Sequence, residues 1–171
     1  MKCEICDLIK EKKGLVFEDE DVIALLHPKP AAPGHIILTS KQHVPIIENC
    51  PNKIVGKLFN VANKVSTGVF EGLQAHGTNI IIQNGVEAGQ TTPHFVINII
   101  PRREKDGLNF QWEPRKVKDE DLESAELQLK EKTENIGIEK EAPKAVEVKK
   151  EKPAEIEGED NYLIKQLERI P

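Results

Sequence analysis

Two short stretches carry residue types that can do chemistry. Near the start of the chain, Cys3 and Cys6 form a C-x-x-C motif, whose thiolates can bind a metal or exchange a disulfide. In "PHFVINII", His94, Val96 and Asn98 occupy alternate positions, so an extended strand would place all three side chains on one face. That face would carry an imidazole, an isopropyl group and a carboxamide, and only the imidazole could act as a nucleophile or base.

The composition limits the class of protein. A chain of 171 residues suits one ordinary domain with an additional segment. The formal net charge of −5 argues against a protein that mainly coats nucleic acid, because such binding relies on clustered Lys and Arg. No apolar run approaches the ~20 residues that span a bilayer, and "MKCEICDLIKEKKG" lacks the apolar core of a secretory signal. We therefore expect a soluble, cytoplasmic protein with neither membrane nor nucleic acid as a partner.

The elements that position these residues follow from the hydrophobic pattern. Apolar runs bounded by turn residues predict five strands, and apolar residues at three- and four-residue steps predict one long helix over 54–73. The predicted strands cover residues 15–18, 22–26, 34–40, 78–83 and 94–100. This order predicts an α+β fold, a half-open antiparallel sheet with helices on one face, followed by a charged C-terminal extension.

The chain changes character beyond its first 115 residues, which we assign to one globular domain. Residues 116–137 have the acidic start and the glycine stop of a helical extension. Residues 138–160 are mostly charged and have little to bury, which predicts a flexible linker. Residues 161–171 place four apolar side chains at helical spacing, which predicts a short amphipathic helix that docks onto a partner.

Five segments follow one another over about residues 1–115: "CEIC", "ALLHPKPAAPGHIIL", "SKQHV", "QNGVEAGQTTPH" and "IIPRREKDGLNFQWEP". Together they resemble the histidine triad (HIT) family of nucleotide-binding hydrolases and transferases. The family signature, His-x-His-x-His followed by two apolar residues, would fall on residues 94–100. The resemblance implies that His94 is the first histidine of the signature, that Val96 stands at the nucleophile position and that Asn98 stands at the third position.

The chemistry of the family depends on the second histidine. HIT enzymes attack an α-phosphorus with an imidazole nitrogen and form a nucleotidyl-histidine intermediate. Val96 has no lone pair, so it can neither form this intermediate nor act as a general base. Asn98 can still donate a hydrogen bond to a phosphate oxygen, and we predict that it contacts a nucleotide. The alternative is that residues 94–100 are simply a buried strand in which Val96 improves packing.

The resemblance also implies a nucleotide pocket that departs from the family pattern. His27 stands where members commonly have an aspartate that holds the ribose hydroxyls, and Gln83 stands where many have an asparagine. Gly89, Gln90 and Thr91 resemble the phosphate loop, in which small residues and backbone N–H groups let an anion approach closely. We expect a purine nucleotide or a related small molecule here. The alternatives are a loop that only shapes a turn and a His27 that is a surface residue without a ligand.

The same resemblance strengthens the C-x-x-C signal. His43 in "SKQHV" and His94 match the positions at which zinc-binding members complete a site, which implies a structural Zn²⁺ held by Cys3, Cys6, His43 and His94. Redox use of the motif would place it at a helix N-terminus after a strand, and nothing strand-like precedes it. A disulfide is disfavoured in the cytosol. Two unliganded cysteines remain the alternative, and Cys50 has no paired neighbour.

Two classes of function remain open, and we predict no catalytic residue. The first is a zinc-containing homodimer that pairs through its long helix and an adjacent strand, binds a nucleotide without turning it over, and contacts a protein partner through its C-terminal extension. The second is an active nucleotidyl hydrolase or transferase that acts on a nucleoside phosphate or phosphoramidate through a non-standard nucleophile such as His27 or a bound water. The role of His35 in "PGHIIL" is open, with a cap or a core hydrogen bond favoured.

Overall fold

A computed structural model gives the structure of the chain and describes residues 3–134 and 136. The chain divides into two compact units, Met1–Trp112 and Glu113–Pro171. The predicted linker over 138–160 and the predicted terminal helix over 161–171 lie outside the described residues. Within the described part of the chain, no helix combines the length and the apolar character that crossing a membrane requires.

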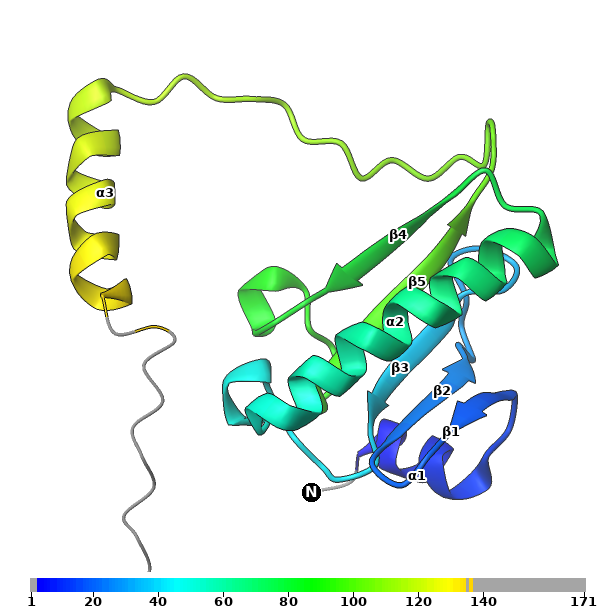
Figure 1. Cartoon of the computed structure of the whole chain (residues 1–171). Helices are drawn as coiled ribbons and strands as arrows, with labels where there is room; N and C mark the ends of the chain where they lie inside the picture. The colour runs from blue at the N-terminus through cyan, green and yellow to red at the C-terminus, as the bar shows by residue number, and fades with distance from the viewer. Residues whose placement is uncertain (1–2, 135, 137–171) are drawn as a thin grey trace, which may run out of the picture. The chain divides into compact units, whose positions relative to one another are not determined.

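The first unit is built on one antiparallel sheet of five strands (Figure 1). The strands are β1 (Leu15–Glu18), β2 (Val22–Leu26), β3 (Ile36–Ser40), β4 (Gly77–Ile82) and β5 (Val96–Arg102). Their order in the sheet is β1-β2-β3-β5-β4, so β1 and β4 form its two edges and the sheet stays open. The predicted α+β class and half-open antiparallel sheet are confirmed.

The long helix α2 (Asn52–Leu73) covers one face of this sheet (Figure 1). It buries Leu58, Val61, Ala62 and Val69, which pack in one apolar cluster with inward-facing residues of β2, β3 and β5. The three- and four-residue spacing of these positions is what forms the helix's apolar stripe. α2 therefore follows the prediction, with two further residues at its N-terminus.

A second helix, α1 (Glu4–Glu11), packs against the opposite face of the sheet. Its buried Ile5 lies in a second apolar cluster with Cys3, Ile23, Leu25 and Ile37. The sequence pattern predicts helices on one face and does not predict this helix, because eight residues give too short a window for the helical period. Glu4 and Asp7 in the first turn favour the helix through its dipole.

Because helices cover both faces of the central strands, these strands are apolar on both sides. Along β2, Val22 and Ala24 face the α2 cluster, whereas Ile23 and Leu25 face the α1 cluster. Such strands appear in the sequence as continuous apolar runs without polar alternation. β5 ends two residues later than predicted, since Pro101 lies beyond the last β3 pair and has a strand neighbour on one side only.

The remaining regular elements are short or solvent-exposed. Two 3₁₀ turns, Ile47–Asn49 and Val86–Ala88, shape the loops before α2 and after β4. In the second unit, α3 (Asp119–Thr133) has no buried residue, an acidic first turn and an i,i+4 ion pair between Glu126 and Lys130. These charges therefore stabilise α3 through interactions within the helix itself.

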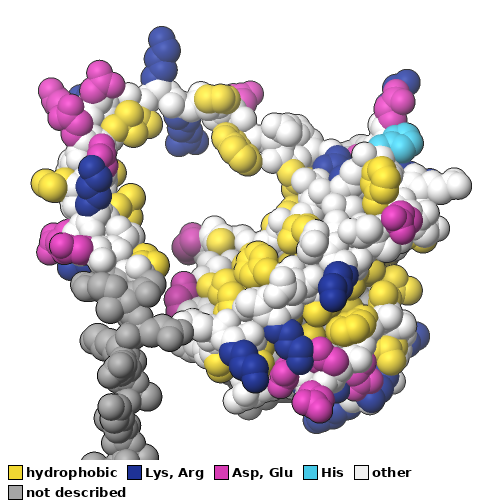
Figure 2. Space-filling view, viewed as in Figure 1, with side chains coloured by type: hydrophobic (Ala, Val, Ile, Leu, Met, Phe, Trp, Pro, Cys, Tyr) yellow, Lys and Arg dark blue, Asp and Glu magenta, His cyan; other side chains and the backbone are white. Residues whose placement is uncertain are grey.

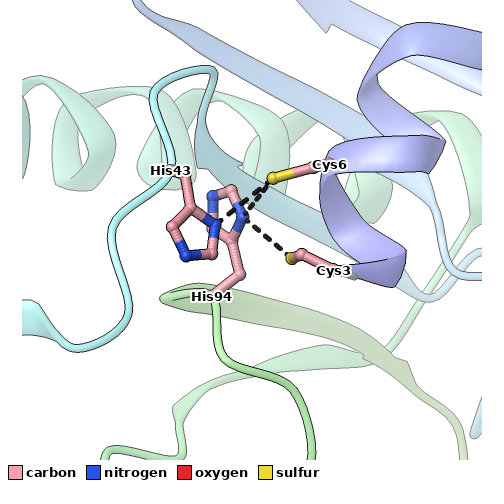
Figure 3. Close-up of side chains that lie close together, drawn as sticks. All are labelled: Cys3, Cys6, His43 and His94. Atoms are coloured by element: carbon pink, nitrogen blue, oxygen red, sulfur yellow. Dashed lines mark hydrogen bonds between the residues drawn. The ribbon is translucent and has the colours of Figure 1, made fainter. Parts of the chain in front are cut away.

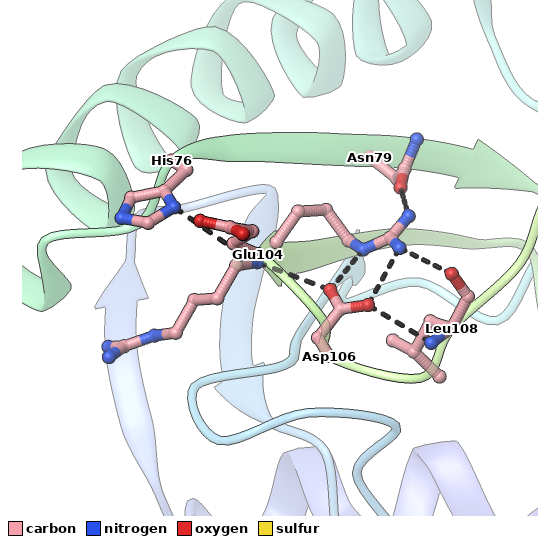
Figure 4. A network of polar contacts seen from close by, with 7 residues as sticks. His76, Asn79, Glu104, Asp106 and Leu108 are labelled. Atoms are coloured by element: carbon pink, nitrogen blue, oxygen red, sulfur yellow. Dashed lines mark hydrogen bonds and ion pairs between the residues drawn. The ribbon is translucent and has the colours of Figure 1, made fainter.

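Arg102 ties the end of β5 to β4 and to the loop that follows (Figure 4). Its guanidinium donates to both carboxylate oxygens of Asp106, at 2.6 and 2.9 Å, to Asn79 Oδ1 and to the Leu108 carbonyl. Asp106 also accepts hydrogen bonds from the backbone N–H groups of Arg103 and Leu108. The hydrogen bonds from the Arg102 guanidinium, joined by these backbone donors, hold the pKa of Asp106 well below its usual range.

This network predicts a pH-dependent contribution to stability. The folded-state pKa of Asp106 is lowered, so its carboxylate stabilises the fold above the unfolded pKa near ~4, and this stabilisation is lost as pH falls through the folded pKa. Asp106→Asn should lower the melting temperature at pH 7, and the difference from wild type should shrink below about pH 4. The exposed Glu104→Gln is the control, and a difference that is the same at pH 7 and pH 3 would contradict the assignment.

Candidate metal centre and nucleotide pocket

The structure brings the four predicted metal ligands together at the N-terminal end of α1 (Figure 3). Cys3 immediately precedes α1 and Cys6 lies in its first turn, whereas His43 follows β3 and His94 precedes β5. Their ligand atoms all lie within 4.8 Å of one another. All three cysteines of the chain are free, and Cys50 is buried in the other apolar cluster.

The distances in this cluster suit a tetrahedral ion. His94 Nδ1 lies 3.6 Å from Cys3 Sγ and 3.5 Å from Cys6 Sγ, and His43 Nδ1 lies 3.3 Å from Cys6 Sγ. Tetrahedral bonds of ~2.3 Å to sulfur and ~2.0 Å to nitrogen separate the two ligand atoms by about 3.5 Å. The three S–N distances are therefore close to those of a Cys2His2 site, and all four ligand atoms lie near enough together to hold one metal ion.

The orientation of His94 is fixed from the other side of its ring. His94 Nε2 lies 3.1 Å from the Ser40 carbonyl oxygen, and because a carbonyl only accepts, Nε2 carries the proton. The lone pair is then on Nδ1, which faces the thiols. Burial lowers the pKa of His94 and so favours the neutral, metal-binding form.

The C-x-x-C motif lies at the N-terminus of α1, a helix that the sequence pattern does not predict. Burial raises the pKa of Cys6, whereas the helix dipole and a bound cation favour its thiolate. A metal that enters here would displace protons from the thiols, because only the thiolate is a ligand. The two imidazoles complete a closed shell, which suits a structural metal better than a disulfide exchange centre.

A small pocket of about 80 Å³ lies beside the metal cluster and is lined by His94. His94, Val96 and Asn98 all face it, so the alternation expected along this stretch is present. The predicted nucleotide-binding residues that line it are His27, Gln83, Gln90, Thr91 and Asn98. The pocket is also lined by three residues that no sequence motif marks, namely Ile5, Ile37 and Thr92.

Gly89 does not line the pocket itself but packs against Gln83, which does. Its φ of +87° belongs to the left-handed region, and a Cβ there would lie 2.6 Å from Gln83 Nε2. Any larger residue would both strain the backbone and displace the Gln83 side chain. The turn and the close packing thus each require glycine at this position.

The Gln90 side chain holds its own loop together and joins it to the loop between β3 and α2. Its Oε1 accepts a hydrogen bond from the Gly85 N–H at 2.8 Å, and its Nε2 donates to the carbonyls of Pro45 and Thr92 at 2.7 and 2.8 Å. Both amide hydrogens and one lone pair of the oxygen are used. The side chain therefore holds the loop, and a contact between Gln90 and a ligand stays a prediction.

His35, whose role the sequence left open, is buried beside the pocket and stacks on His27 with ring centroids 4.5 Å apart. Its Nδ1 accepts a hydrogen bond from the Ala31 N–H at 3.1 Å, so the neutral ring carries its proton on Nε2. Nε2 then donates to Asn98 Oδ1 at 3.1 Å. Burial lowers the pKa of His35 and supports the neutral form.

His27 has a similar arrangement. Its Nδ1 accepts a hydrogen bond from the Lys29 N–H at 2.9 Å, which leaves the proton on Nε2. Burial lowers the pKa of His27 as well. The second nitrogen of the His27 ring, Nε2, is therefore an N–H donor.

The model of the HIT domain family matches residues 10–105, more than half of the chain, and the chain belongs to this family. It is 29% identical over 108 residues to the adenylylsulfatase HINT3 of Arabidopsis thaliana, covering 62% of this chain and only 55% of that protein. It is 33% identical over 129 residues to a bis(5'-adenosyl)-triphosphatase of Dictyostelium discoideum, covering 70% of this chain and 86% of that protein.

The fold is also that of solved family members. A zinc-bound histidine triad family protein from Mycobacterium smegmatis superposes with a TM-score of 0.60 at 29% identity, over 77% of this chain and 98% of that chain. The family identification from five sequence segments is thus confirmed. Nucleotide-binding and hydrolase-type proteins are the class to which the chain is related.

Proposed function

We propose that this protein binds a purine nucleotide, contains a structural zinc ion and does not turn the nucleotide over. The observation that carries the proposal is the state of its imidazoles. In each of the five histidines Nδ1 is already engaged: His27 with the Lys29 N–H, His35 with the Ala31 N–H, His43 and His94 with the thiols, and His76 with the Glu104 N–H. A neutral ring whose Nδ1 accepts a hydrogen bond or binds a metal carries its proton on Nε2.

It follows that no imidazole offers a free lone pair to phosphorus. Nucleophilic catalysis needs that lone pair, and Val96 supplies none at the central position of β5. The alternative, a hydrolase or transferase that uses His27, would first have to break the hydrogen bond from the Lys29 N–H. The relatives named for adenylylsulfate and diadenosine triphosphate support an adenosine nucleotide as the class of ligand.

The proposal predicts the outcome of a turnover experiment. Incubated with adenosine 5'-phosphoramidate or diadenosine triphosphate, the protein should hydrolyse either compound at the buffer rate, and intact-mass spectrometry should detect no AMP adduct. The double variant Val96→His with Asn98→His is the positive comparison, and it should gain turnover only if the pocket around His27 and Gln83 still accepts the substrate. An AMP adduct on any histidine of the wild type would overturn the binding-only function.

The zinc proposal is supported by the spacing of the Cys2His2 cluster and by the zinc-bound relative. Protein purified without chelator should contain about one zinc per chain, and Cys6→Ser should reduce this to near zero and lower the melting temperature, because metal binding stabilises only the folded state. Cys50→Ala is the matched control, since Cys50 lies outside the cluster and should leave the zinc content unchanged. Metal analysis by mass spectrometry that finds no zinc in the wild type would rule the site out.

We further propose a homodimer that pairs through α2 and the edge strand β4. Figure 2 shows hydrophobic side chains exposed along α2, and Phe59, Phe70 and Ile80 are 47%, 53% and 44% exposed. A C2 dimer would bury such residues against their own copies. Light scattering should give twice the chain mass, and Phe59→Glu should give the monomer, whereas Leu127→Glu on the exposed α3 should not. A monomeric wild type at micromolar concentration would refute the pairing.

Two proposals concern the rest of the molecule. We propose a cytoplasmic location, because the cytosol keeps thiols reduced and would leave Cys3 and Cys6 able to bind zinc. We also propose that the C-terminal segment 161–171 binds a protein partner, because its apolar residues recur at helical spacing.

A further inference from the structure

We propose that Cys3 and Cys6 form a site of oxidative modification, at which a hydroperoxide converts the two thiols to a disulfide, loosens α1 and weakens ligand binding in the adjacent pocket. This inference rests on the proposed zinc and nucleotide binding and adds a means of regulating both. The two cysteines have different roles. The peroxide attacks Cys6, and Cys3 then displaces the oxidised group to close the disulfide.

Access to solvent distinguishes the two thiols. Within the metal cluster Cys3 and His94 are buried, Cys6 is partly exposed and His43 is exposed. A peroxide can therefore reach the cluster from the side of Cys6 and His43, whereas Cys3 is only 6% exposed. Both sulfurs are thiolates when they bind a metal, so access decides which of them reacts first. The partly exposed Cys6 is that thiol.

The backbone places the two sulfurs where a disulfide can form. Cys3 is the N-cap of α1, since its carbonyl accepts a hydrogen bond from the Asp7 N–H at 3.2 Å, and Cys6 is the third residue of the helix. Residues three apart on a helix are neighbours, with Cβ atoms ~5–6 Å apart. The two Sγ atoms lie within 4.8 Å of each other (Figure 3). Rotation of the two side chains can therefore join the sulfurs while the helix stays wound.

The reaction consumes one molecule of hydroperoxide. The Cys6 thiolate attacks a peroxide oxygen, the O–O bond breaks, and a sulfenic acid forms on Cys6 while the departing hydroxide takes up a proton. The Cys3 thiolate then attacks the Cys6 sulfur, the S–O bond breaks, and a second hydroxide takes up a proton. The two sulfurs together lose two electrons, and hydrogen peroxide is reduced to two water molecules.

A disulfide would remove two of the four ligands, so the protein would release the metal. The metal cluster joins the start of α1 to His43 after β3 and to His94 before β5, whereas the disulfide joins only Cys3 and Cys6 to each other. α1 would then be attached through its apolar side alone, and an eight-residue helix is marginal without such attachments. Because Ile5 of this helix lines the pocket, a loosened α1 also loosens the pocket wall.

Peptide mapping of the full-length protein, as purified and after treatment with hydrogen peroxide, tests the modification. Wild type should form the Cys3–Cys6 disulfide, and its zinc content should fall from about one per chain to near zero. If dimedone is present during the treatment, its adduct should appear on Cys6 and not on Cys3, because it traps sulfenic acids. Cys50, which is as buried as Cys3 and lies outside the cluster, should stay reduced and is the internal control.

Two serine variants test the assigned roles. In Cys3→Ser the oxidation should stop at the sulfenic acid of Cys6, whereas in Cys6→Ser the buried Cys3 should remain unmodified over the same time. Each variant lacks one metal ligand, so loss of the metal cannot by itself produce this asymmetry. Labelling of Cys50 reports unfolding of either variant, and the dimedone adduct of the wild type then decides between the two roles.

Isothermal titration and hydrogen exchange test the coupling to the pocket. Oxidised wild type should bind AMP about threefold or more weakly than the reduced, zinc-loaded protein, because only molecules with α1 docked bind at full strength. The amides of α1 should exchange faster after oxidation. Dithiothreitol followed by zinc should restore both properties, and Cys50→Ala should behave as wild type throughout.

The proposed function and the oxidation fail through different results. If the reduced protein contains no zinc or does not bind AMP, the proposed function fails and the regulation fails with it. If both bind but peroxide gives no Cys3–Cys6 disulfide, or if dimedone labels Cys3 in preference to Cys6, the modification site fails and the proposed function stands. Equal AMP affinity and equal exchange of α1 in the reduced and oxidised protein would overturn the coupling to the pocket.

Discussion

The hydrogen bond between His94 Nε2 and the Ser40 carbonyl is the interaction on which both sites depend. It joins His94, two residues before β5, to Ser40, the last residue of β3, and it fixes which nitrogen of His94 faces the thiols. An eight-residue helix such as α1 is marginal in isolation, so α1 needs the apolar contacts of Ile5 and an attachment at its N-terminal end. A metal shared by His94 and the two cysteines at the start of α1 would supply that attachment. α1 in turn brings Ile5 to the pocket.

The two proposed roles of residues 94–98 are compatible because they use different residues of this stretch. His94 belongs to the metal cluster, Asn98 is paired with His35, and Val96 lies between them and packs against the apolar cluster under α1. The two interpretations left open for Val96 therefore agree. The same isopropyl group that cannot attack phosphorus contributes apolar contacts to the α1 face of the sheet.

Much of the fold could be predicted from the sequence because its signals are local. β1 and β2 begin and end where their apolar runs and the acidic turn between them predict, and α2 follows its spacing of three and four. α1 was missed because Ile5, Leu8 and Ile9 alone do not distinguish a short helix from an irregular segment. β5 passes through Pro101 because its neighbour β3 has already ended there, which depends on sheet register and not on local sequence.

The same distinction between local and long-range signals applies to the candidate site. The residues of the metal cluster could be named from the sequence, because the two cysteines and two histidines stand in segments that resemble those of a known family. The hydrogen bonds that decide their chemistry could not, because they depend on contacts between distant parts of the chain. His35 reaches Asn98 only because β3 and β5 pair with Ile37 opposite Asn98, and its proton is placed by a backbone N–H in the preceding loop. A residue type states which hydrogen bonds are available, whereas register and backbone donors determine which of them a ligand finds unused. For His94 this explains why a histidine would persist without catalysis: both of its nitrogens already have structural partners.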